Sequence, residues 1–420
     1  MVSEEDALEA HRRSRGKVEM VSKVPLLTKE DMSTYYTPGV AYVSEAIKKE
    51  KGLAYTYTNK SNSVAIVSDG TRILGLGNVG PEAGIPVMEG KAILFKKFGG
   101  IDAVPLCIGT TDENEIIKFI TNIAPSFGAV NIEDIESPKC FRVLDTLSGA
   151  IDIPVFHDDR QGTSVVVLAA LLNALKLAGK GKAAKIVIDG AGAAGFGVTE
   201  LLNFAGFSNV YVLDRAGLIS SDRKEHMNDY KERIAGMTNP DKRSGSLDEA
   251  ANGADALIGF SGSGRFEKGI LSLMSEKPIL FPLSNPTPEI SYADAKDAGA
   301  FIAATGRSDT PNQINNLLAF PGVLRGILDV RAKSVNFGML YAASIALAKS
   351  TGRGLGTERV LPNLTEKGAS LSITPGIAAA VAKAAVETGV ARLSPTGDDV
   401  KANAKAMIKR YARLERRLIL

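Results

Sequence analysis

Two pairs of adjacent carboxylates are the residues in this sequence best suited to chemistry. Glu133 with Asp134, and Asp158 with Asp159, each follow a short apolar stretch. Carboxylates at strand ends of an α/β fold stand where the active sites of such folds form. The chain has only three histidines and two cysteines among 420 residues, so a metal site must be built mainly from oxygen atoms. Such a donor set suits Mg²⁺ or Mn²⁺. Taken singly, each pair is more often a helix cap or a solvated turn, but together they favour one assembled site.

A glycine-rich loop indicates a second ligand. The segment Gly190-Ala-Gly192-Ala193-Ala194-Gly195 follows an apolar strand pattern at 185–189 and opens a helical pattern. In such a loop the first glycine allows a tight turn, the second lets backbone N–H groups approach a pyrophosphate, and the third lets helix and strand pack closely. The helix N-terminus then faces the phosphate charge. The loop predicts a dinucleotide site, and a ligand-free glycine-rich turn is the alternative.

The end of the next strand pattern bears on which dinucleotide binds. Asp214 stands 19 residues after Gly195 (214 − 195), where an acid that binds the ribose hydroxyls is expected. Its charge would repel a 2′-phosphate and favours NAD⁺. The adjacent Arg215 could instead hold that phosphate, or be an ordinary surface arginine. We predict NAD⁺ ahead of NADP⁺ and leave both open.

The elements that position these residues fall into two groups. Before residue 157 we expect a strand at 63–67, a glycine-rich loop at 74–81 and a helix at 113–121. From about residue 157, an apolar helix at 163–177 precedes alternating strand and helix patterns, with strands at 185–189, 209–214, 254–260, 278–283 and 300–305. This alternation predicts a parallel, doubly wound sheet. We therefore predict an α/β protein with an N-terminal α/β substrate domain at 1–156 and a C-terminal Rossmann-type domain, with added C-terminal helices, at 157–420.

Composition excludes several classes of partner. Lys plus Arg number 50 and Asp plus Glu number 47, a formal charge of +3, which argues against nucleic acid. We expect no membrane partner, because no apolar run approaches the ~18 residues of a span. The acidic start, 1–6, does not read as a signal peptide. Two cysteines are too few for a disulfide framework and fit a reducing compartment, so we predict a cytoplasmic protein. The basic helix expected at 399–420 is interpreted as a solvated or oligomer-facing surface.

Eight motifs in this order resemble those of the malic enzymes, in the smaller prokaryotic form. They are Tyr36-Thr-Pro-Gly-Val40, Asp69-Gly-Thr-Arg-Ile-Leu-Gly-Leu-Gly77, Gly84-Ile-Pro-Val-Met-Glu-Gly-Lys91, Ile132-Glu-Asp134, His157-Asp-Asp-Arg-Gln-Gly-Thr163, Gly190 to Gly195, Leu283-Ser-Asn-Pro-Thr287 and Asn315-Asn-Leu-Leu-Ala-Phe-Pro-Gly322. The resemblance implies oxidative decarboxylation of L-malate to pyruvate and CO₂ with reduction of NAD(P)⁺, dependence on a divalent metal, and decarboxylation of oxaloacetate as a related activity. It also implies a homodimer or a dimer of dimers.

The resemblance further implies residue roles. Lys91 would be the general base, Tyr36 the general acid, and Asp158 the hydrogen-bonding support of Lys91. The remaining roles are metal binding by Glu133, Asp134 and Asp159; substrate binding by Arg72, Asn285, Asn315 and Asn316; and cofactor binding by Thr163, Gly190, Gly192, Ala193, Ala194, Gly195, Asp214, Arg215 and Asn285.

The chemistry of these side chains is compatible with those roles and leaves some alternatives open. A lysine acts as a base only when burial or a nearby cation lowers its pKa. A tyrosine phenol is protonated at neutral pH and can donate. Spacing does not separate Tyr36 from Tyr35, nor decide which of Asp158 and Asp159 meets the metal; those assignments rest on the family. The rival functions are a malolactic reaction, which yields L-lactate without net NADH, and a non-catalytic dinucleotide sensor.

Overall fold

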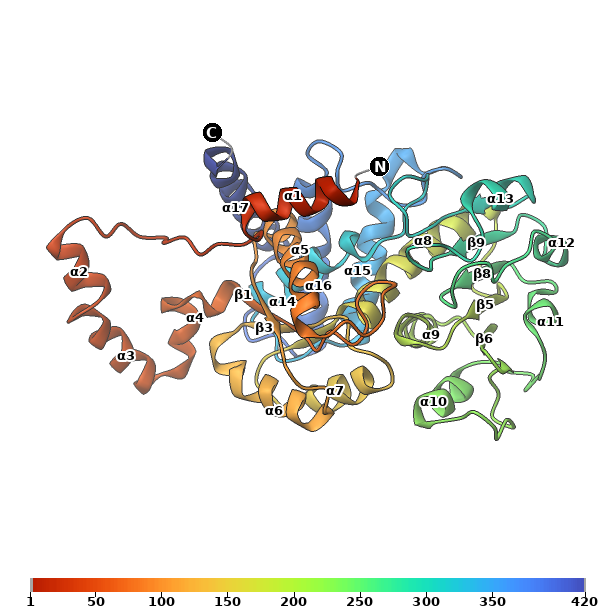
Figure 1. The fold of residues 1–420 in the computed structure, drawn as a ribbon, viewed down its shortest axis with the longest axis horizontal. Helices are drawn as coiled ribbons and strands as arrows, with labels where there is room; N and C mark the ends of the chain where they lie inside the picture. Colours follow the sequence, from red (N-terminus) through yellow and green to blue (C-terminus); the bar gives the residue numbers. More distant parts are fainter. Residues whose placement is uncertain (1–2, 419–420) are drawn as a thin grey trace.

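Two parallel sheets organise the chain, which is described at residues 3–418 by a computed structural model (Figure 1). The first sheet has the order β2-β1-β3-β4, with β1 at Ser63–Ser68, β2 at Asp102–Cys107, β3 at Ala129–Ile132 and β4 at Val155–His157. Its connecting helices are α5 (Pro81–Gly99), α6 (Glu113–Ile123) and α7 (Lys139–Leu147). Ile132 of β3 pairs with His157 of β4, so the carboxylate pairs that follow both strands leave the sheet side by side at its carboxyl edge.

The second sheet has the order β10-β9-β8-β5-β6-β7, and only β7 runs antiparallel to its neighbour. Its strands are β5 (Ile186–Asp189), β6 (Val210–Asp214), β7 (Gly217–Leu218), β8 (Ala256–Gly259), β9 (Ile279–Pro282) and β10 (Ile302–Ala303). Helices α8 (Thr163–Ala178), α9 (Ala193–Phe204), α10 (Asp229–Met237), α11 (Leu247–Ala251), α12 (Ile270–Leu273) and α13 (Tyr292–Asp297) accompany it. The predicted α/β class with a Rossmann-type sheet is confirmed.

Alternating side chains of the second sheet belong to two separate apolar cores. Ile186 and Ile188 of β5 pack in the larger core, which also contains Val64 and Ile66 of the first sheet. Val187 points to the opposite face and packs in a smaller core. Both faces of a parallel sheet are covered in this way, which explains the nearly continuous apolar run of β5. The larger core joins the two sheets.

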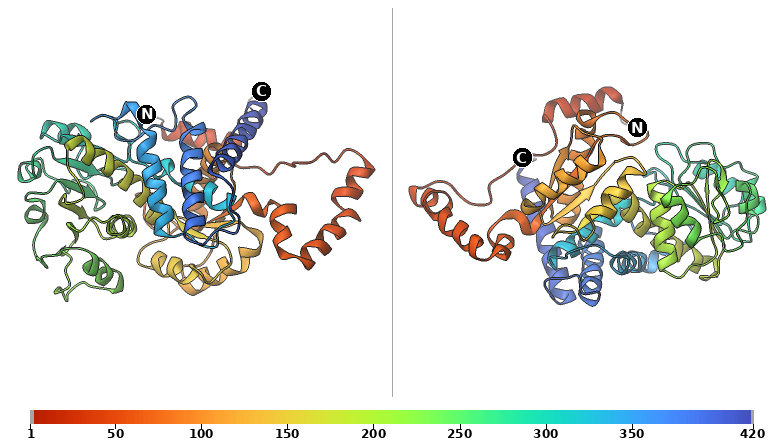
Figure 2. Two further views of the ribbon diagram at one scale, coloured as in Figure 1. Left: turned by 180° about the vertical axis from the view of Figure 1, so that it is seen from behind. Right: turned by 90° about the horizontal axis from the view of Figure 1, so that it is seen from below.

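The C-terminal helices return to the first sheet. They are α14 (Phe320–Asp329), α15 (Phe337–Ser350), α16 (Ile373–Glu387) and α17 (Gly397–Leu418). Helices α14 and α17 pack against α5, while α15 packs against α8 (Figure 2). Seven short turns complete the structure: a π-helical turn at Asp158–Gly162 (η4) and 3₁₀ turns at Lys51–Leu53, Asn59–Asn62, Ala124–Ser126, Asn316–Leu318 (η5), Gly352–Gly354 and Ala369–Leu371, within the described residues.

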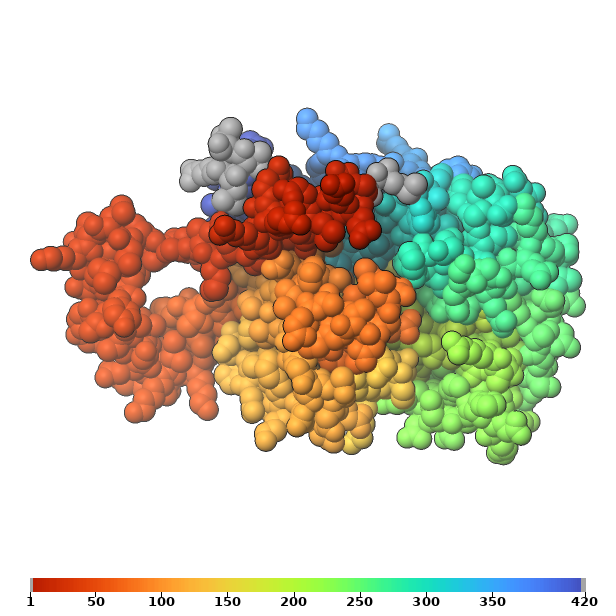
Figure 3. Space-filling view, viewed as in Figure 1, coloured from red at the N-terminus to blue at the C-terminus, as the bar shows by residue number. Residues whose placement is uncertain are grey.

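An N-terminal arm projects from the body (Figures 1 and 2). Helix α1 (Glu4–Ser14) lies beside α5, and the chain then leads outward to α2 (Lys29–Tyr35), α3 (Gly39–Lys49) and α4 (Ala54–Tyr57). Local signals define these helices: the Thr28 hydroxyl and the Asp31 carboxylate form a reciprocal capping box at the start of α2. We call residues 24–58 the arm. Figure 3 shows the arm standing apart from the rest of the surface, with open space between them.

Two helical stretches are long and apolar enough to cross a membrane, Asp158–Ala178 and Ala369–Glu387. The expectation that no apolar stretch reaches that length was wrong. Both stretches lie largely inside the fold, where α8 packs against α9 and α15, and α16 packs against α14 and α15. A buried helix of a globular core has the same apolar composition, so their burial accounts for it.

Candidate active site

The carboxylates predicted as metal ligands converge at the carboxyl edge of the first sheet. One oxygen each of Glu133, Asp134 and Asp159 lies within 4.8 Å of the others. The backbone N–H of Asp134 donates to Asp159 Oδ2 at 3.3 Å, which ties the loop after β3 to the turn after β4. Asn131, two residues before Glu133 on β3, donates from its amide to Glu133 Oε2 at 2.7 Å and fixes that side chain.

Lys91 lies beside this cluster, on α5. Its Nζ is 2.5 Å from Asp158 Oδ2 and 2.9 Å from Glu133 Oε1. It also lies 4.3 Å from the centroid of the Phe320 ring, which α14 supplies. The lysine side chain is only 10% exposed, so its charge is balanced by these carboxylates rather than by water. The structure therefore brings Lys91, Asp158 and the three carboxylates into one constellation.

The charges of this constellation do not cancel. Four carboxylates (Glu133, Asp134, Asp158 and Asp159) face Lys91, a sum of −4 + 1 = −3 when all are ionised. Burial raises the pKa of Glu133 well above its usual range, and the neighbouring carboxylates add to this. Burial and the Asp159 carboxylate raise the pKa of Asp134 to about 7. Burial alone would lower the pKa of Lys91, but Asp158 and Glu133 outweigh it and hold that pKa above its ordinary value.

This excess of negative charge, the all-oxygen donor set and the mutual approach of the three carboxylates fit a divalent cation. A hard cation with oxygen ligands would offset both the burial of these charges and their mutual repulsion, which together raise the pKa values of Glu133 and Asp134. The Oδ1 atom of Asp158 is buried and has no hydrogen-bond partner. Asp158 therefore has an unused acceptor, which lies on the side of Gly162, while its Oδ2 contacts Lys91.

The π-helical turn η4 sets the position of Asp158. A Cβ atom at Gly162 would come within 2.0 Å of Asp158 Oδ1, so the turn can bring the carboxylate this close only because residue 162 has no side chain. The His157 ring is fully buried, and its Nδ1 accepts from the Arg160 N–H at 3.1 Å. Burial lowers the pKa of His157 to about 4, so the ring is neutral at pH 7. His157 thus acts as a hydrogen-bonding residue of the turn.

The dinucleotide loop lies next to η4. Gly190 has φ +124°, a conformation that side chains disfavour, and a Cβ at Gly195 would meet Gly190 O at 1.8 Å. Nothing lies within 4 Å of a Cβ at Gly192, which leaves room for a ligand at the N-terminus of α9. Arg160 of η4 forms two hydrogen bonds of 2.9 Å with Glu200 of α9. The predicted loop geometry is thus present and joined to the carboxylate turn.

Asp214 differs from the free carboxylate that the sequence suggested. Arg223 donates to both of its oxygens, at 2.9 and 2.5 Å, Lys231 lies 2.7 Å from Oδ2, and Ala216 N–H donates to Oδ1 at 2.8 Å. Burial alone would raise the pKa of Asp214, but the hydrogen bonds from Arg223 and Lys231 lower it to about 2. Each oxygen already accepts two N–H groups, so no acceptor remains for a ribose hydroxyl. Arg215 is exposed beside it.

The residues expected to hold substrate come from both sheets. The backbone N–H of Arg72 donates to Asp134 O at 3.1 Å, and the Arg72 charge is one of those that lower the pKa of Asp134. Three residues later, a Cβ at Gly75 would lie 2.5 Å from Pro286 Cδ. The loop that carries Arg72 therefore touches the Asn285-Pro286 segment after β9, across the boundary between the sheets. Thr163 begins α8 directly after η4.

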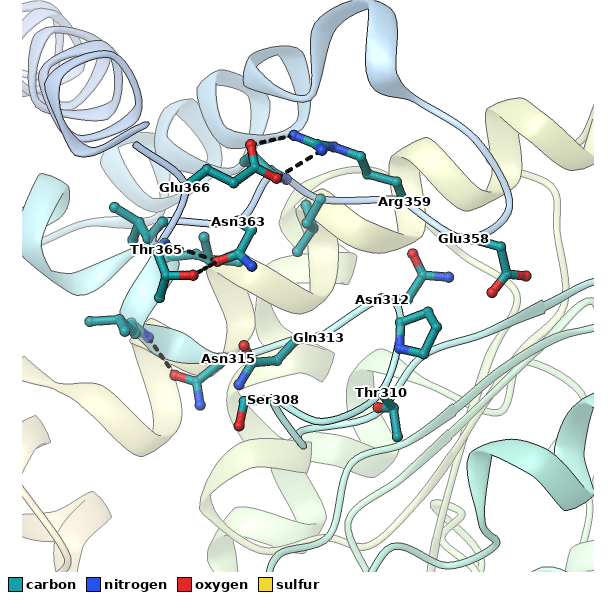
Figure 4. A pocket seen from close by; sticks show the side chains of 16 residues that line it. Ser308, Thr310, Asn312, Gln313, Asn315, Glu358, Arg359, Asn363, Thr365 and Glu366 are labelled. Carbon is teal, nitrogen blue, oxygen red and sulfur yellow. Dashed lines mark hydrogen bonds and ion pairs between the residues drawn. The ribbon is translucent and has the colours of Figure 1, made fainter. Parts of the chain in front are cut away.

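Asn315 and Asn316 have different surroundings. Asn315 Oδ1 accepts from Leu317 N at 2.8 Å and caps η5, so this side chain has a structural task. It also lines a cavity of about 230 Å³ with Asn312, Gln313 and the paired Arg359 and Glu366 (Figure 4). Neither Lys91 nor any of the four carboxylates around it lines that cavity. Asn316 is the first residue of η5. That turn packs against η4, which carries Asp158 and Asp159.

Tyr36 is not part of this constellation within one chain. It follows α2 in the arm, 65% exposed, and Figure 1 shows α2 projecting away from α5. Tyr35, the alternative acid, lies at the end of α2 and is exposed as well. Sequence reasoning placed Tyr36 in the site through the motif alone and had no signal for the course of the arm.

Sequence reasoning also missed three residues that shape the site. Asn131 could have been found, because residues two apart on a strand share a face and Asn131 precedes Glu133 by two. Phe320 lies in the motif at 315–322, which assigned it no role, and its partner Lys91 is 229 residues away (320 − 91). Arg223 is nine residues from Asp214 (223 − 214), and no local pattern pointed to it.

Comparison with known proteins agrees with this geometry. Residues 15–116 match the model of the malic enzyme N-terminal domain, and residues 160–386 match that of the malic enzyme NAD-binding domain. The chain belongs to the malic enzyme family. It is 46% identical over 398 residues to the bifunctional malic/malolactic enzyme of Bacillus subtilis, covering 94% of this chain and 96% of that protein. It is 46% identical over 379 residues to the NAD-dependent malic enzyme of Geobacillus stearothermophilus, covering 90% and 78%.

A solved structure shows the same fold. The crystal structure of malic enzyme from Pyrococcus horikoshii aligns with a TM-score of 0.93 at 45% identity, covering 97% of this chain and 96% of that one. Relatives named NADP-dependent malic enzymes also match, at 38–42% identity. The predicted family, enzyme class and use of a nicotinamide dinucleotide are confirmed.

Proposed function

We propose that this malic enzyme family member oxidatively decarboxylates L-malate to pyruvate and CO₂, reducing NAD⁺ or NADP⁺ with a divalent cation bound by Glu133, Asp134 and Asp159. The observation that carries the proposal is the buried contact of Lys91 with Asp158 and Glu133, beside that carboxylate trio. The turn η4, which carries Asp158 and Asp159, also packs against α9, the helix that the dinucleotide loop opens. A dinucleotide sensor would need neither the lysine nor the trio.

We assign the two proton transfers of the reaction to Lys91 and Tyr36. Deprotonated Lys91 Nζ takes the proton of the 2-hydroxyl group as hydride leaves C2 for the nicotinamide. When bound, Mg²⁺ or Mn²⁺ supplies Lewis-acid polarisation of the substrate oxygen at C2. The Tyr36 phenol then donates a proton to C3 of the enolate left by loss of CO₂. Each such transfer contributes roughly 10²–10⁴-fold to the rate.

The carboxylates around Lys91 and a bound cation act on it in opposite directions. Asp158 and Glu133 raise the pKa of Lys91, whereas a divalent cation held by the neighbouring carboxylates would lower it and favour the free amine. Once Glu133 serves as a ligand, its charge is shared and Asp158 alone holds the lysine in place. Arg72, Asn285 and Asn316 provide the hydrogen-bond donors for the two carboxylates of malate, from the loop after β1, the loop after β9 and η5. Asn315 contributes by fixing η5.

The structure removes the reason for which the sequence favoured NAD⁺. Both oxygens of Asp214 already accept from their partners. We call Asp214, Arg215, Arg223 and Lys231 the corner after β6; three cations and one carboxylate give it a formal charge of 3 − 1 = +2. A net positive corner attracts a 2′-phosphate. We therefore propose that NADP⁺ is accepted at least as well as NAD⁺, with Arg215 on the open side of the corner.

A malolactic reaction is the second candidate, because the Bacillus subtilis relative is named a bifunctional malic/malolactic enzyme. The same residues could serve it, with the hydride returned to the keto acid so that L-lactate is released. Product analysis separates the two reactions.

We further propose that the protein is a cytoplasmic homodimer or dimer of dimers. We also propose that it divides into a substrate domain at 1–156 and a nucleotide domain at 157–420, whose helices α14, α16 and α17 pack back on the first sheet.

Cation binding provides the test of the proposed site. Mn²⁺ affinity is measured by calorimetry for the wild-type protein and for the Glu133→Gln, Asp134→Asn and Asp159→Asn variants. Each variant should lose Mn²⁺ affinity together with malate-dependent reduction of NAD(P)⁺. The Glu136→Gln variant is the control, since Glu136 lies in the same segment but pairs with Lys139. Wild-type activity that survives exhaustive chelation would contradict the proposal.

A further inference from the structure

Four charged side chains form a closed ring beside the carboxylate turn η4. Arg160 of η4 forms two hydrogen bonds of 2.9 Å with Glu200 of α9 and donates to Asp145 Oδ1 at 3.1 Å. Arg233 of α10 donates to Asp145 Oδ2 at 2.7 Å and to Glu200 Oε1 at 2.9 Å. Each arginine thus bridges the same two carboxylates, and the formal charge of the four groups is zero. We call these four residues the ion ring.

The ion ring joins elements that belong to different sheets. Asp145 lies on α7 and Arg160 directly follows β4, so both belong to the first sheet. Glu200 and Arg233 lie on α9 and α10, which accompany the second sheet, and Figure 1 shows α7 beside these two helices. The pair of Arg160 with Glu200 and the pair of Arg233 with Asp145 therefore each cross from one sheet to the other.

The crossing pair of Arg160 and Glu200 is buried. Both side chains are only 6% exposed. The Arg160 guanidinium carbon also lies 4.6 Å from the ring centroid of Phe196 and 5.6 Å from that of Phe141. A two-pronged contact between arginine and carboxylate has a defined geometry, and separating a buried pair leaves each charge without a partner and away from water. The pair therefore resists any sliding of α9 along η4.

The backbone of Arg160 makes a second close approach to the same helix. A Cβ atom at Gly197 would lie 2.2 Å from the Arg160 carbonyl oxygen, so α9 comes this near only because residue 197 is a glycine. Helix α9 begins at Ala193, and Gly197 and Glu200 lie about one and about two turns beyond that start. One residue thus holds, by its backbone and its side chain, the helix that the dinucleotide loop opens.

This position matters because η4 and α9 each hold one of the two reactants in the proposed function. Asp159, which precedes Arg160, is a proposed cation ligand, and Asp158 contacts Lys91 at 2.5 Å. The dinucleotide would lie at the N-terminus of α9. Hydride transfer requires the two reacting carbon atoms to be about 3–3.5 Å apart, and a misplacement of about 1 Å can cost about 10²-fold in rate.

We propose that Arg160 is a positioning residue for hydride transfer, which acts through Glu200 and Asp145 to set the cation-bound malate against the dinucleotide. The inference rests on the proposed function, in which η4 and α9 hold the two reactants. In this role Arg160 touches neither reactant and instead fixes the distance between them. Opening the ion ring should therefore slow the chemical step more than it weakens the binding of either reactant.

Glu200→Gln tests this role, because the amide keeps the size of the side chain and removes its charge. Single-turnover reduction of the dinucleotide is followed at saturating L-malate and Mn²⁺, and deuterium at C2 of L-malate identifies the hydride-transfer phase by its isotope effect. The rate of that phase should fall by about 10- to 100-fold. Mn²⁺ affinity, measured by calorimetry, and dinucleotide affinity, measured by fluorescence, should each change by less than about threefold.

Two further variants guard against a folding defect in Glu200→Gln. Arg233 is 44% exposed, and Arg233→Gln breaks one of the two pairs that cross between the sheets. Its hydride-transfer rate should fall by a smaller factor than that of Glu200→Gln, and it decides the question if Glu200→Gln does not fold. Arg160→Lys keeps the positive charge without the two-pronged contact, so its rate should lie between those of wild type and Arg160→Gln.

The matched control is Arg325→Gln. The Arg325 side chain is 3% exposed and pairs with Asp329 on the same helix, α14, so the substitution breaks a similarly buried ion pair that does not connect η4 with α9. Its melting temperature should fall because a buried charge loses its partner. Its hydride-transfer rate should stay within about threefold of wild type.

The outcomes separate the inference from the proposed function. An unchanged hydride-transfer rate in Glu200→Gln would overturn the inference and leave the proposed function standing. So would cation and dinucleotide affinities that fall as much as the rate, or an equal loss of rate in Arg325→Gln. Wild-type protein without malate-dependent reduction of NAD⁺ or NADP⁺ would instead overturn the proposed function and this inference with it.

Discussion

The Arg223→Ala substitution should shift cofactor preference toward NAD⁺. Arg223 occupies one acceptor position on each oxygen of Asp214. Its removal leaves both positions for the two hydroxyl groups of an unphosphorylated ribose. The charge of the corner also falls from +2 to +1, because Arg215 and Lys231 remain against Asp214. The first effect favours NAD⁺ and the second disfavours NADP⁺, so they act in the same direction.

The size of the shift follows from the lost charge. A unit charge about 7 Å from a 2′-phosphate of charge about −1.5 contributes roughly 0.9–3.6 kcal/mol for an effective dielectric constant between about 80 and 20. That free energy corresponds to about 5- to 400-fold in affinity. The assay is kcat/KM for NAD⁺ and for NADP⁺ at saturating L-malate and Mn²⁺. The NAD⁺-to-NADP⁺ ratio should rise by a factor within this range and rise less at high salt.

Lys224→Ala is the control. Lys224 is exposed and adjacent to Arg223 in sequence, so its substitution removes one positive charge without removing a hydrogen bond to Asp214. Its effect on the ratio should be several times smaller. An unchanged ratio in Arg223→Ala, with an unchanged melting temperature, would refute the reasoning. A ratio that falls would show that Asp214 does not face the ribose.

Three further predictions concern the carboxylates and the proton donors. Gly162→Ala should displace the Asp158 carboxylate, because the new Cβ would lie 2.0 Å from Oδ1, and should lower kcat at least tenfold with little change in dinucleotide affinity measured by fluorescence; equal loss of both would contradict it. Lys91→Ala should nearly abolish malate oxidation. Tyr36→Phe should still release CO₂ from supplied oxaloacetate but protonate enolpyruvate slowly, and the partitioning of oxaloacetate between reduction to malate and decarboxylation measures this difference. A Tyr36→Phe protein that loses hydride transfer as completely as Lys91→Ala would contradict the two roles. The pKa of Asp214, about 2 when folded against about 3.9 unfolded, means that its stabilisation is present above about pH 4 and lost as pH falls toward 2; Asp214→Asn should flatten that loss in urea unfolding, and an unchanged slope would contradict it.

The strands of the second sheet were predictable from sequence because each is short, apolar and followed by a turn. β5 was expected at 185–189 and lies at Ile186–Asp189, and β6 was expected at 209–214 and lies at Val210–Asp214. Both are covered on two faces, so the local pattern and the tertiary environment agree. β10 was expected at 300–305 but comprises only Ile302–Ala303, because the edge position gives it one neighbour to pair with.

The parts of the candidate site that directly follow strands were predictable from sequence. The parts whose position depends on packing between residues distant in sequence were not. The register of β3 and β4 brings Glu133 and Asp158 to one edge, as two carboxylate pairs after two strands suggested. The state of Asp214 depends on Arg223 and Lys231, which lie beyond β7 and at α10, outside any local pattern. The position of Tyr36 depends on how the arm leaves the sheet, which neither its helix caps nor its motif encode.

Product analysis with L-malate tests the central claim most directly. Purified protein is incubated with L-malate, Mn²⁺ and either NAD⁺ or NADP⁺, while nucleotide reduction, pyruvate and L-lactate are quantified together. The constellation of Lys91, Asp158 and the carboxylate trio predicts reduced nucleotide and pyruvate in equal amounts, with no product after chelation and recovery on addition of Mn²⁺. L-Lactate formed without net nucleotide reduction, or no malate-dependent reduction of either dinucleotide, would contradict the account.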